Sequence, residues 1–255
     1  MFQFIRNWLD SRIIQRSTVT PEEWADAYAS LPLLKGLPDD EMRFLKNLAI
    51  LFLDQKIFEG AHGLEVTRSM RLIIALQACL LLLKLDTRRY HGWVTVIVYP
   101  EGFAPKQVIR DEYGVEHHTQ STLAGQAWLR GPVILAWDET MNSGELDGDN
   151  VVIHEFAHKL DMRNGVANGF PTLPSGMDAK EWAAIFSAGF EDFQDRCARG
   201  NDIGIDCYAA TSPAEFFAVL SEVFFEHPAI LNKQYAAIYD QLRLYYRQDP
   251  LVRLG

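Results

Sequence analysis

The sequence lacks a long apolar run and an excess of basic residues, and each absence excludes a class of protein. The most apolar stretch, residues 70–85, is interrupted by Arg71, Gln77 and Lys84, and it is shorter than the ~20 apolar residues that a membrane-spanning helix needs. We therefore expect no transmembrane segment and interpret this stretch as a buried core helix. The net charge is −10, from 24 basic and 34 acidic residues, so we expect no direct binding to a nucleic acid.

Cysteine is scarce as well. The chain has three cysteines, Cys79, Cys197 and Cys207, and no CxxC motif. Three cysteines without paired spacing do not predict a disulfide framework, and such a composition suits a reducing compartment. We therefore expect each cysteine to be a small buried apolar residue. Residues 1–16 mix apolar side chains with arginines, but no small-residue cleavage site follows. These features predict a cytoplasmic protein without a signal peptide.

Length and composition predict one globular domain. The 255 residues are 48% hydrophobic and 23% charged, which is typical of soluble proteins, and we find no repeat or interdomain linker. We expect a single domain over residues 1–255, with residues 1–90 mostly helical.

Helix and strand signals in the sequence favour an α+β fold. Proline and acidic residues directly after a capping residue or at a helix start predict helices from Pro21 and from Pro38, and Thr67 is a candidate cap for the apolar helix. Runs of β-branched and aromatic residues predict strands at 93–99 and 132–137 and a hairpin at 107–110 and 115–118. Further helices are predicted at 177–198, 214–226 and 232–247. We expect the small sheet to lie beside an active-site helix.

That helix is residues 151–161, which contain His154-Glu155-Phe156-Ala157-His158. Positions four apart lie on the same face of a helix, so His154 and His158 can direct both imidazoles at one metal ion, as tetrahedral zinc requires. Glu155 lies about 100° round the helix, where it can take a proton from the attacking water and later give one to the leaving amine. This is the HExxH pattern of zinc metallopeptidases.

The alternative is a helix whose histidines make only ordinary hydrogen bonds. Asp147, Asp149 and Asn150 offer capping side chains ahead of the motif, and apolar residues occupy several faces of the helix. The helix should therefore be buried, where unpaired polar groups are costly. This context favours the metal site.

A catalytic zinc takes three protein ligands. Asp161 and Asn164 stand where a metzincin needs glycine and histidine, which excludes that class and leaves a carboxylate from a later helix. The candidates are Glu181, Glu215, Glu222 and Glu226. Glu215 and Glu222 are two turns apart on nearly the same face, so spacing alone cannot separate them. Asp161 could accept from a ligand histidine's second ring N–H or from a backbone donor, or cap the helix end.

Four segments resemble the Mlc titration factor A family of bacterial zinc peptidases. They are residues 63–83, 133–139, 147–161 and 208–228. The combination of HEFxHxxD with Tyr-x₆-Glu-Phe-Phe-Ala also resembles the catalytic domain of anthrax lethal factor. The resemblance implies a zincin-like core, Zn²⁺ as cofactor, Glu215 as the third metal ligand, and Tyr208 near the zinc.

The implied function is that of a zinc-dependent, aminopeptidase-like enzyme acting on peptide substrates. The domain over residues 1–255 would then be a single zinc-peptidase domain, with residues 91–255 as its catalytic part. Glu155 would be its general base, and the Tyr208 phenol could donate to the oxyanion at the scissile carbonyl. Strand 133–137 could pair with an extended substrate, and Asp138 or Glu139 could capture the substrate's α-amine. The second hypothesis is a regulatory binding protein, because the family's namesake sequesters Mlc, a glucose-responsive transcriptional repressor.

Overall fold

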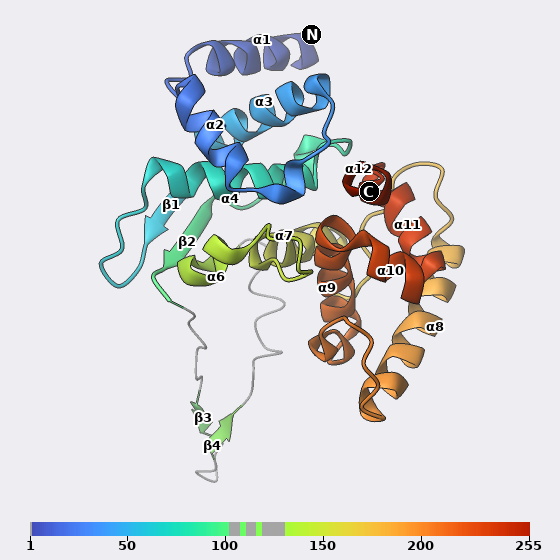
Figure 1. The fold of residues 1–255 in the computed structure, drawn as a ribbon. Helices are drawn as coiled ribbons and strands as arrows, with labels where there is room; N and C mark the ends of the chain where they lie inside the picture. Colours follow the sequence, from blue (N-terminus) through green and yellow to red (C-terminus); the bar gives the residue numbers. More distant parts are fainter. Residues whose placement is uncertain (1, 102–107, 111–115, 119–130) are drawn as a thin grey trace.

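The computed structural model describes residues 2–101, 108–110, 116–118 and 131–255, and its N-terminal helices are layered at one end of the molecule (Figure 1). These helices are α1 (Phe2–Gln15), α2 (Pro21–Ala29), α3 (Asp39–Gln55) and α4 (Arg68–Leu80), with the short 3₁₀ helix η1 (Pro32–Leu34) between α2 and α3. The predicted helix starts are confirmed. Thr20 Oγ1 accepts from the Glu23 N–H and Glu23 Oε2 accepts from the Thr20 N–H, a capping box that satisfies donors at the start of α2.

Three parallel strands form the sheet, in the order β1-β2-β5. They are β1 (Ile57–Gly60), β2 (Thr95–Tyr99) and β5 (Val133–Ala136). Register pairs Val96 with Val133, and both side chains are buried in the core. The predicted α+β class and the strands within 93–99 and 132–137 are confirmed, whereas β1 is a strand that the sequence analysis missed. Because β1 has four residues, it is too short to show the alternation that identifies strands.

The predicted hairpin is confirmed where the structure describes it. β3 (Val108–Arg110) pairs antiparallel with β4 (Glu116–His118). Gln107 and Val115, which the prediction included, lie outside the described residues.

The C-terminal half consists mainly of helices (Figure 1). They are α6 (Trp137–Asn142), α7 (Val151–Asp161), α8 (Ala179–Ala198), α9 (Pro213–Glu226), α10 (Pro228–Gln234), α11 (Ala236–Tyr246) and α12 (Pro250–Leu254), with the 3₁₀ helices η3 (Met162–Asn164) and η4 (Cys207–Ala210). Another 3₁₀ helix, η2 (Thr87–Tyr90), precedes β2 in the N-terminal half. The single helix predicted at 232–247 is wrong, because Tyr235 has φ −142° and ψ 63° and separates α10 from α11.

Aromatic packing fixes α7 against the rest of the core. The Phe156 ring is fully buried, and its centroid lies 5.7 Å from that of Phe52, 5.1 Å from Tyr90 and 5.6 Å from Trp93. Large buried rings contribute much of a core's stability. The helix that carries the HExxH motif is thereby held by α3, by η2 and by the segment that leads into β2.

One expectation about the cysteines is wrong. Cys197 and Cys207 form a disulfide with a Cα–Cα distance of 5.8 Å, within the usual range for such bonds. Spacing along the sequence did not indicate this pair, because the contact depends on how the chain returns from the end of α8 to η4. Cys79 is free and buried in α4, as predicted.

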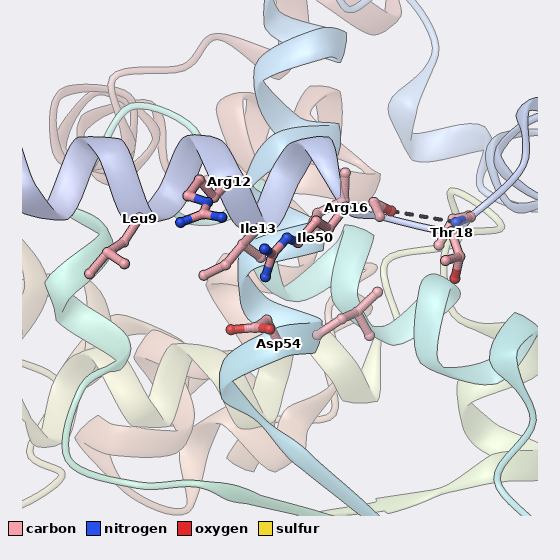
Figure 2. Close-up of a pocket in the computed structure, with 10 residues that line it drawn as sticks. Leu9, Arg12, Ile13, Arg16, Thr18, Ile50 and Asp54 are labelled. Carbon is pink, nitrogen blue, oxygen red and sulfur yellow. Dashed lines mark hydrogen bonds between the residues drawn. The ribbon is translucent and has the colours of Figure 1, made fainter.

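A pocket of about 410 Å³ lies between α1 and α3 (Figure 2). Apolar side chains such as Ile13 and Ile50 line it, together with Arg12, Arg16 and Asp54. None of its lining residues comes from α7 or α9, so it is separate from the HExxH helix. Among the described helices, none has both the length and the apolar character that crossing a membrane requires.

Candidate metal centre

The α7 helix presents its two motif histidines because its other faces are buried. Asn150 is the N-cap, and its Oδ1 accepts from the Ile153 N–H at 2.8 Å. Ile153 and Phe156 are fully buried, which leaves His154 and His158 on a half-buried face. This capping and burial pattern is what the sequence predicted for residues 151–161.

The third residue of the group is a glutamate from α9, which packs beside α7. Ser212 caps α9 by accepting from the Glu215 N–H at 3.2 Å, and Pro213 occupies the first turn, a favourable position for proline. Glu215 lies in that same turn. Most of the remainder of α9 is buried, so the helix is held rigidly and its first turn is presented to α7.

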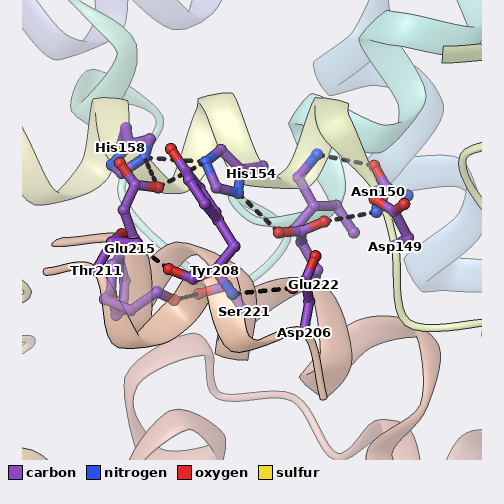
Figure 3. A network of polar contacts seen from close by, with 12 residues as sticks. Asp149, Asn150, His154, His158, Asp206, Tyr208, Thr211, Glu215, Ser221 and Glu222 are labelled. Atoms are coloured by element: carbon purple, nitrogen blue, oxygen red, sulfur yellow. Dashed lines mark hydrogen bonds and ion pairs between the residues drawn. The ribbon is translucent and has the colours of Figure 1, made fainter. Parts of the chain in front are cut away.

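The three side chains converge on one point (Figure 3). His154 Nε2 lies 3.1 Å from His158 Nε2 and 3.0 Å from Glu215 Oε2, and His158 Nε2 lies 3.2 Å from Glu215 Oε2. Ligands about 2.0–2.1 Å from a tetrahedral metal are about 3.3 Å apart, so this triangle matches the size of a metal site. His154, His158 and Glu215 could therefore hold a metal ion.

The charges at the triangle reinforce this arrangement. Burial alone would raise the pKa of Glu215, but its hydrogen bonds to His154 and His158 lower that pKa far below its usual range. Burial lowers the pKa of His154, yet its hydrogen bonds to Glu215 and Glu222 and nearby negative charges raise it well above normal. The carboxylates of Glu215 and Glu222 thus favour positive charge on the imidazole between them.

Sequence spacing left Glu222 as a candidate third metal ligand, but Glu222 is not part of the triangle. Its Oε1 lies 2.7 Å from His154 Nδ1, on the opposite side of the imidazole ring from the triangle, and its Oε2 accepts from the Asn150 N–H at 2.6 Å. A carboxylate on Nδ1 fixes the tautomer that leaves Nε2 free to bind a metal. Glu222 is therefore placed to orient His154, whereas Glu215 completes the triangle.

The other glutamates that the sequence analysis considered lie outside the triangle. Glu226 Oε1 accepts from Asn150 Nδ2 at 2.5 Å, and Gln77 Oε1 from α4 accepts from the same amide nitrogen at 2.7 Å. Burial raises the pKa of Glu226 to about 7. Glu181 is in the first turn of α8 and is not part of the triangle. Asn150, at the start of α7, thus bonds Glu226 through its side chain and Glu222 through its backbone N–H.

Tyr208 lies at the mouth of the centre. It sits in η4 and is 42% exposed, and its ring centroid is 6.2 Å from that of His154 (Figure 3). Partial burial, together with the negative charges of Glu215 and Glu155 and a hydrogen bond to Glu215, raises the pKa of Tyr208 to about 12. The phenol therefore stays protonated at neutral pH and can donate a hydrogen bond.

Glu155 and Glu139 border the same region. Glu155 is half-buried on α7, as are His154 and His158. Burial, followed by the negative charges of Asp138, Asp149 and Glu155, raises the pKa of Glu139, which indicates that these carboxylates are close enough to interact. Glu139 is exposed in the first turn of α6. The α6 helix was not predicted from the sequence, and it is what brings Glu139 to this rim.

Asp161 accepts hydrogen bonds from backbone donors, one of the alternatives that the sequence analysis left open. Its Oδ2 accepts from the backbone N–H groups of Asn168 and Gly169, each at 2.7 Å. Burial raises the pKa of Asp161 to about 6, against the lowering effect of these hydrogen bonds. Asp161 therefore ties the segment after η3 to the end of α7 through backbone donors.

Comparison with known proteins identifies close sequence relatives. The sequence profile of the family described as glucose-regulated metallo-peptidase M90 matches residues 5–247. A Mlc titration factor A of Serratia proteamaculans (strain 568) is 38% identical over 243 residues, covering 94% of this chain and 92% of that protein. Proteins of the same name from Yersinia pestis (strain Pestoides F) and Yersinia pseudotuberculosis serotype O:3 (strain YPIII) are each 38% identical over 235 residues, covering 91% of this chain and 86% of each relative.

Proposed function

The chain belongs to the glucose-regulated metallo-peptidase M90 family, and from that premise we propose that it is a zinc-dependent peptidase of the aminopeptidase type. The observation that carries the proposal is the triangle of His154, His158 and Glu215, whose ligand atoms are 3.0–3.2 Å apart. Two imidazoles and one carboxylate are the ligand set of many catalytic zinc sites, which keep a fourth position open. The donor set therefore supports Zn²⁺ as the resident metal.

Each residue of the centre has a role in peptide hydrolysis. A bound metal would supply Lewis acidity, polarising the scissile carbonyl and lowering the pKa of water. Glu155 takes the proton of the attacking water and passes it to the leaving amine. Tyr208, protonated because its pKa is raised to about 12, donates a hydrogen bond to the oxyanion at the scissile carbon.

The acidic rim supports recognition of a free amino terminus. Glu139 is exposed and is close enough to Glu155 for their charges to interact. A carboxylate at that position would attract the α-ammonium group of a peptide and align its first peptide bond. β5 lies at the edge of the described sheet, and an extended substrate could pair with it as an added strand.

Hydrolysis of aminoacyl-anilides and short peptides tests the catalytic part of the proposal. Wild type should cleave, and Glu155→Gln should keep its metal while losing about 10²–10⁴-fold in kcat, the usual contribution of a general base. A Glu155→Gln protein that retained both metal and wild-type kcat would refute the proposed mechanism.

Amine recognition has its own test. Glu139→Gln should raise KM for peptides with a free amino terminus by about tenfold, the effect of one lost charge contact worth ~1.4 kcal/mol. The same substitution should leave the slow cleavage of N-acetylated peptides unchanged. An equal effect on both substrate sets would contradict the role of Glu139.

The names of the relatives favour a second function, binding of a transcriptional repressor of the Mlc type. Three relatives that are 38% identical over most of this chain are called Mlc titration factor A. Purified repressor and purified Glu155→Gln protein provide the test, because a binding role does not need the catalytic base. Binding that survives this substitution supports the second function, and the absence of a complex with wild type would exclude it.

A further inference from the structure

The Cys197–Cys207 disulfide joins the end of α8 to η4, the element that carries Tyr208 beside the candidate metal centre. Cys197 is in the last turn of α8 and is half-buried, whereas Cys207 is the first residue of η4 and is exposed. The third cysteine differs from both. Cys79 is fully buried in α4, and burial raises the pKa of its thiol far above normal, which makes it unreactive. Only the bonded pair is therefore accessible to thiol chemistry.

The bond closes the loop of residues 199–206 between α8 and η4. Gly200 and Gly204 in this loop have φ of +70° and +69°, a conformation that glycine adopts without strain. Gln194 Nε2 of α8 donates to the Ala210 carbonyl of η4 at 2.9 Å. The disulfide and this hydrogen bond thus act together to hold η4 against the end of α8.

Breaking the disulfide would loosen η4 without detaching it. Ala209 is fully buried, and Gln234 Nε2 holds the Ile203 carbonyl at 3.1 Å, so the loop and η4 keep anchors that do not depend on sulfur. The residue directly after Cys207 is Tyr208, whose hydroxyl reaches Glu215. The covalent clamp therefore lies one residue from the candidate oxyanion donor.

We propose that Cys197 and Cys207 are a modification site for small thiols and disulfides, and that their bond positions Tyr208 for catalysis. This inference rests on the proposed peptidase function. The oxidised protein is the fast form and the reduced protein is the slow form. Exposed disulfides are the labile and regulatory ones, and Cys207 has the exposure that this chemistry requires.

A small-molecule thiol such as glutathione is the reductant of the Cys197–Cys207 bond. A thiolate attacks the Cys207 sulfur, forming a mixed disulfide and releasing Cys197 as a thiolate that takes up a proton. A second thiol molecule attacks the mixed disulfide, releasing the small-molecule disulfide and leaving Cys207 as a thiol. The protein thereby gains two electrons and two protons, and excess oxidised small molecule reverses both steps.

The expected effect is on turnover and not on substrate binding. Removing one oxyanion-hole donor costs about 10²–10³-fold in kcat. Loosening such a donor without removing it should cost less, about tenfold, because Tyr208 still samples its productive position. KM for a short substrate and the metal content should change by less than about twofold, since His154, His158 and Glu215 are held by α7 and α9.

The experiment uses the full-length, metal-loaded protein in glutathione buffers of graded redox ratio. Thiol alkylation followed by mass measurement gives the fraction with the Cys197–Cys207 bond, and kcat and KM are measured on the same samples. The expected result is a kcat that follows the disulfide fraction and returns on reoxidation. Two free thiols at these positions in every buffer, or a kcat independent of the disulfide fraction, would overturn the proposal.

Variants test whether the disulfide acts by positioning Tyr208 or only by stabilising the fold. Cys197→Ser and Cys207→Ser should have the kcat of the reduced wild type in every buffer, whereas Cys79→Ala should keep the redox response. In Tyr208→Phe the oxidised and reduced forms should have equal kcat, because the hydroxyl through which the disulfide acts is gone. A redox response that persists undiminished in Tyr208→Phe would refute the link to this residue.

A separate readout keeps the inference testable if no peptide is hydrolysed. Amide hydrogen exchange over residues 206–211 should become at least about tenfold faster on reduction, with no change over residues 151–161. That result would support the redox site even while the peptidase function failed. Unchanged exchange over 206–211 on reduction would overturn the redox inference independently of any enzyme assay.

Discussion

The Glu222→Gln substitution should weaken metal binding, because the glutamate has two acceptor oxygens and the glutamine has only one. The carboxylate of Glu222 accepts from Asn150 N–H at 2.6 Å and faces His154 Nδ1 at 2.7 Å. Glutamine has a single acceptor oxygen, so it can satisfy only one of these two partners. If its oxygen stays on the fixed backbone N–H of Asn150, its amide N–H groups face Nδ1. They then favour the tautomer that places a proton on Nε2, the atom that faces the proposed metal site.

The magnitude follows from the usual cost of losing a residue that orients a metal-binding histidine. Such losses reduce metal affinity by about 10–100-fold, or about 1.4–2.7 kcal/mol. Competition with a chromophoric chelator measures the dissociation constant of zinc for wild type and variant, without needing an activity assay. The ratio of the two constants is the predicted quantity.

Glu226→Gln is the matched control. Glu226 lies one turn further along α9 and is buried to a similar degree, at 2% exposed against 4% for Glu222, but its Oε1 bonds the Asn150 side chain and not a ligand histidine. Its replacement should change metal affinity by less than about threefold, or under ~0.7 kcal/mol. A Glu222→Gln protein whose affinity stayed within that margin would refute the argument that Glu222 orients His154.

Three further predictions concern stability. Zinc at a hundred times its dissociation constant should raise the unfolding free energy by about 2.7 kcal/mol and the melting temperature by roughly 5–10 °C, and Glu215→Ala should abolish this shift in a thermal melt. Burial raises the pKa of Glu226 from 4.5 to about 7, so its contribution is complete below pH 4.5 and is lost as the pH rises through 7. Urea unfolding at pH 5 and pH 8 should show a loss of up to about 3 kcal/mol that is smaller in Glu226→Gln; an identical loss in both proteins would contradict the assignment. Gly169 and Gly176 both have positive φ, but a Cβ at Gly169 would lie 2.3 Å from the Pro213 carbonyl, whereas Gly176 faces open space. Gly169→Ala should therefore lose about 1–3 kcal/mol more than Gly176→Ala in urea unfolding, and equal losses would contradict the close contact.

Local features of the chain were readable from the sequence because they depend on near neighbours. The pairing of His154 with His158 follows from helix geometry, and the caps at Thr20 and Asn150 follow from side-chain chemistry one turn ahead. The apolar pattern of residues 70–85 likewise predicted a buried helix, which α4 forms as far as Leu80, whereas residues 81–85 form turns. Resemblance then assigned Glu215, which spacing alone had left equivalent to Glu222.

Tertiary structure alone decided the features that depend on contacts between distant segments. The packing of α7 against α9 sets Glu215 against Nε2 of His154 and Glu222 against Nδ1 of the same ring, a distinction that the spacing of two residues on one helix face cannot show. The parallel pairing of β1 with β2 and the return of the chain from α8 to η4, which brings Cys197 to Cys207, are non-local in the same way. Sequence periodicity records which face of an element is buried, but not which partner covers it.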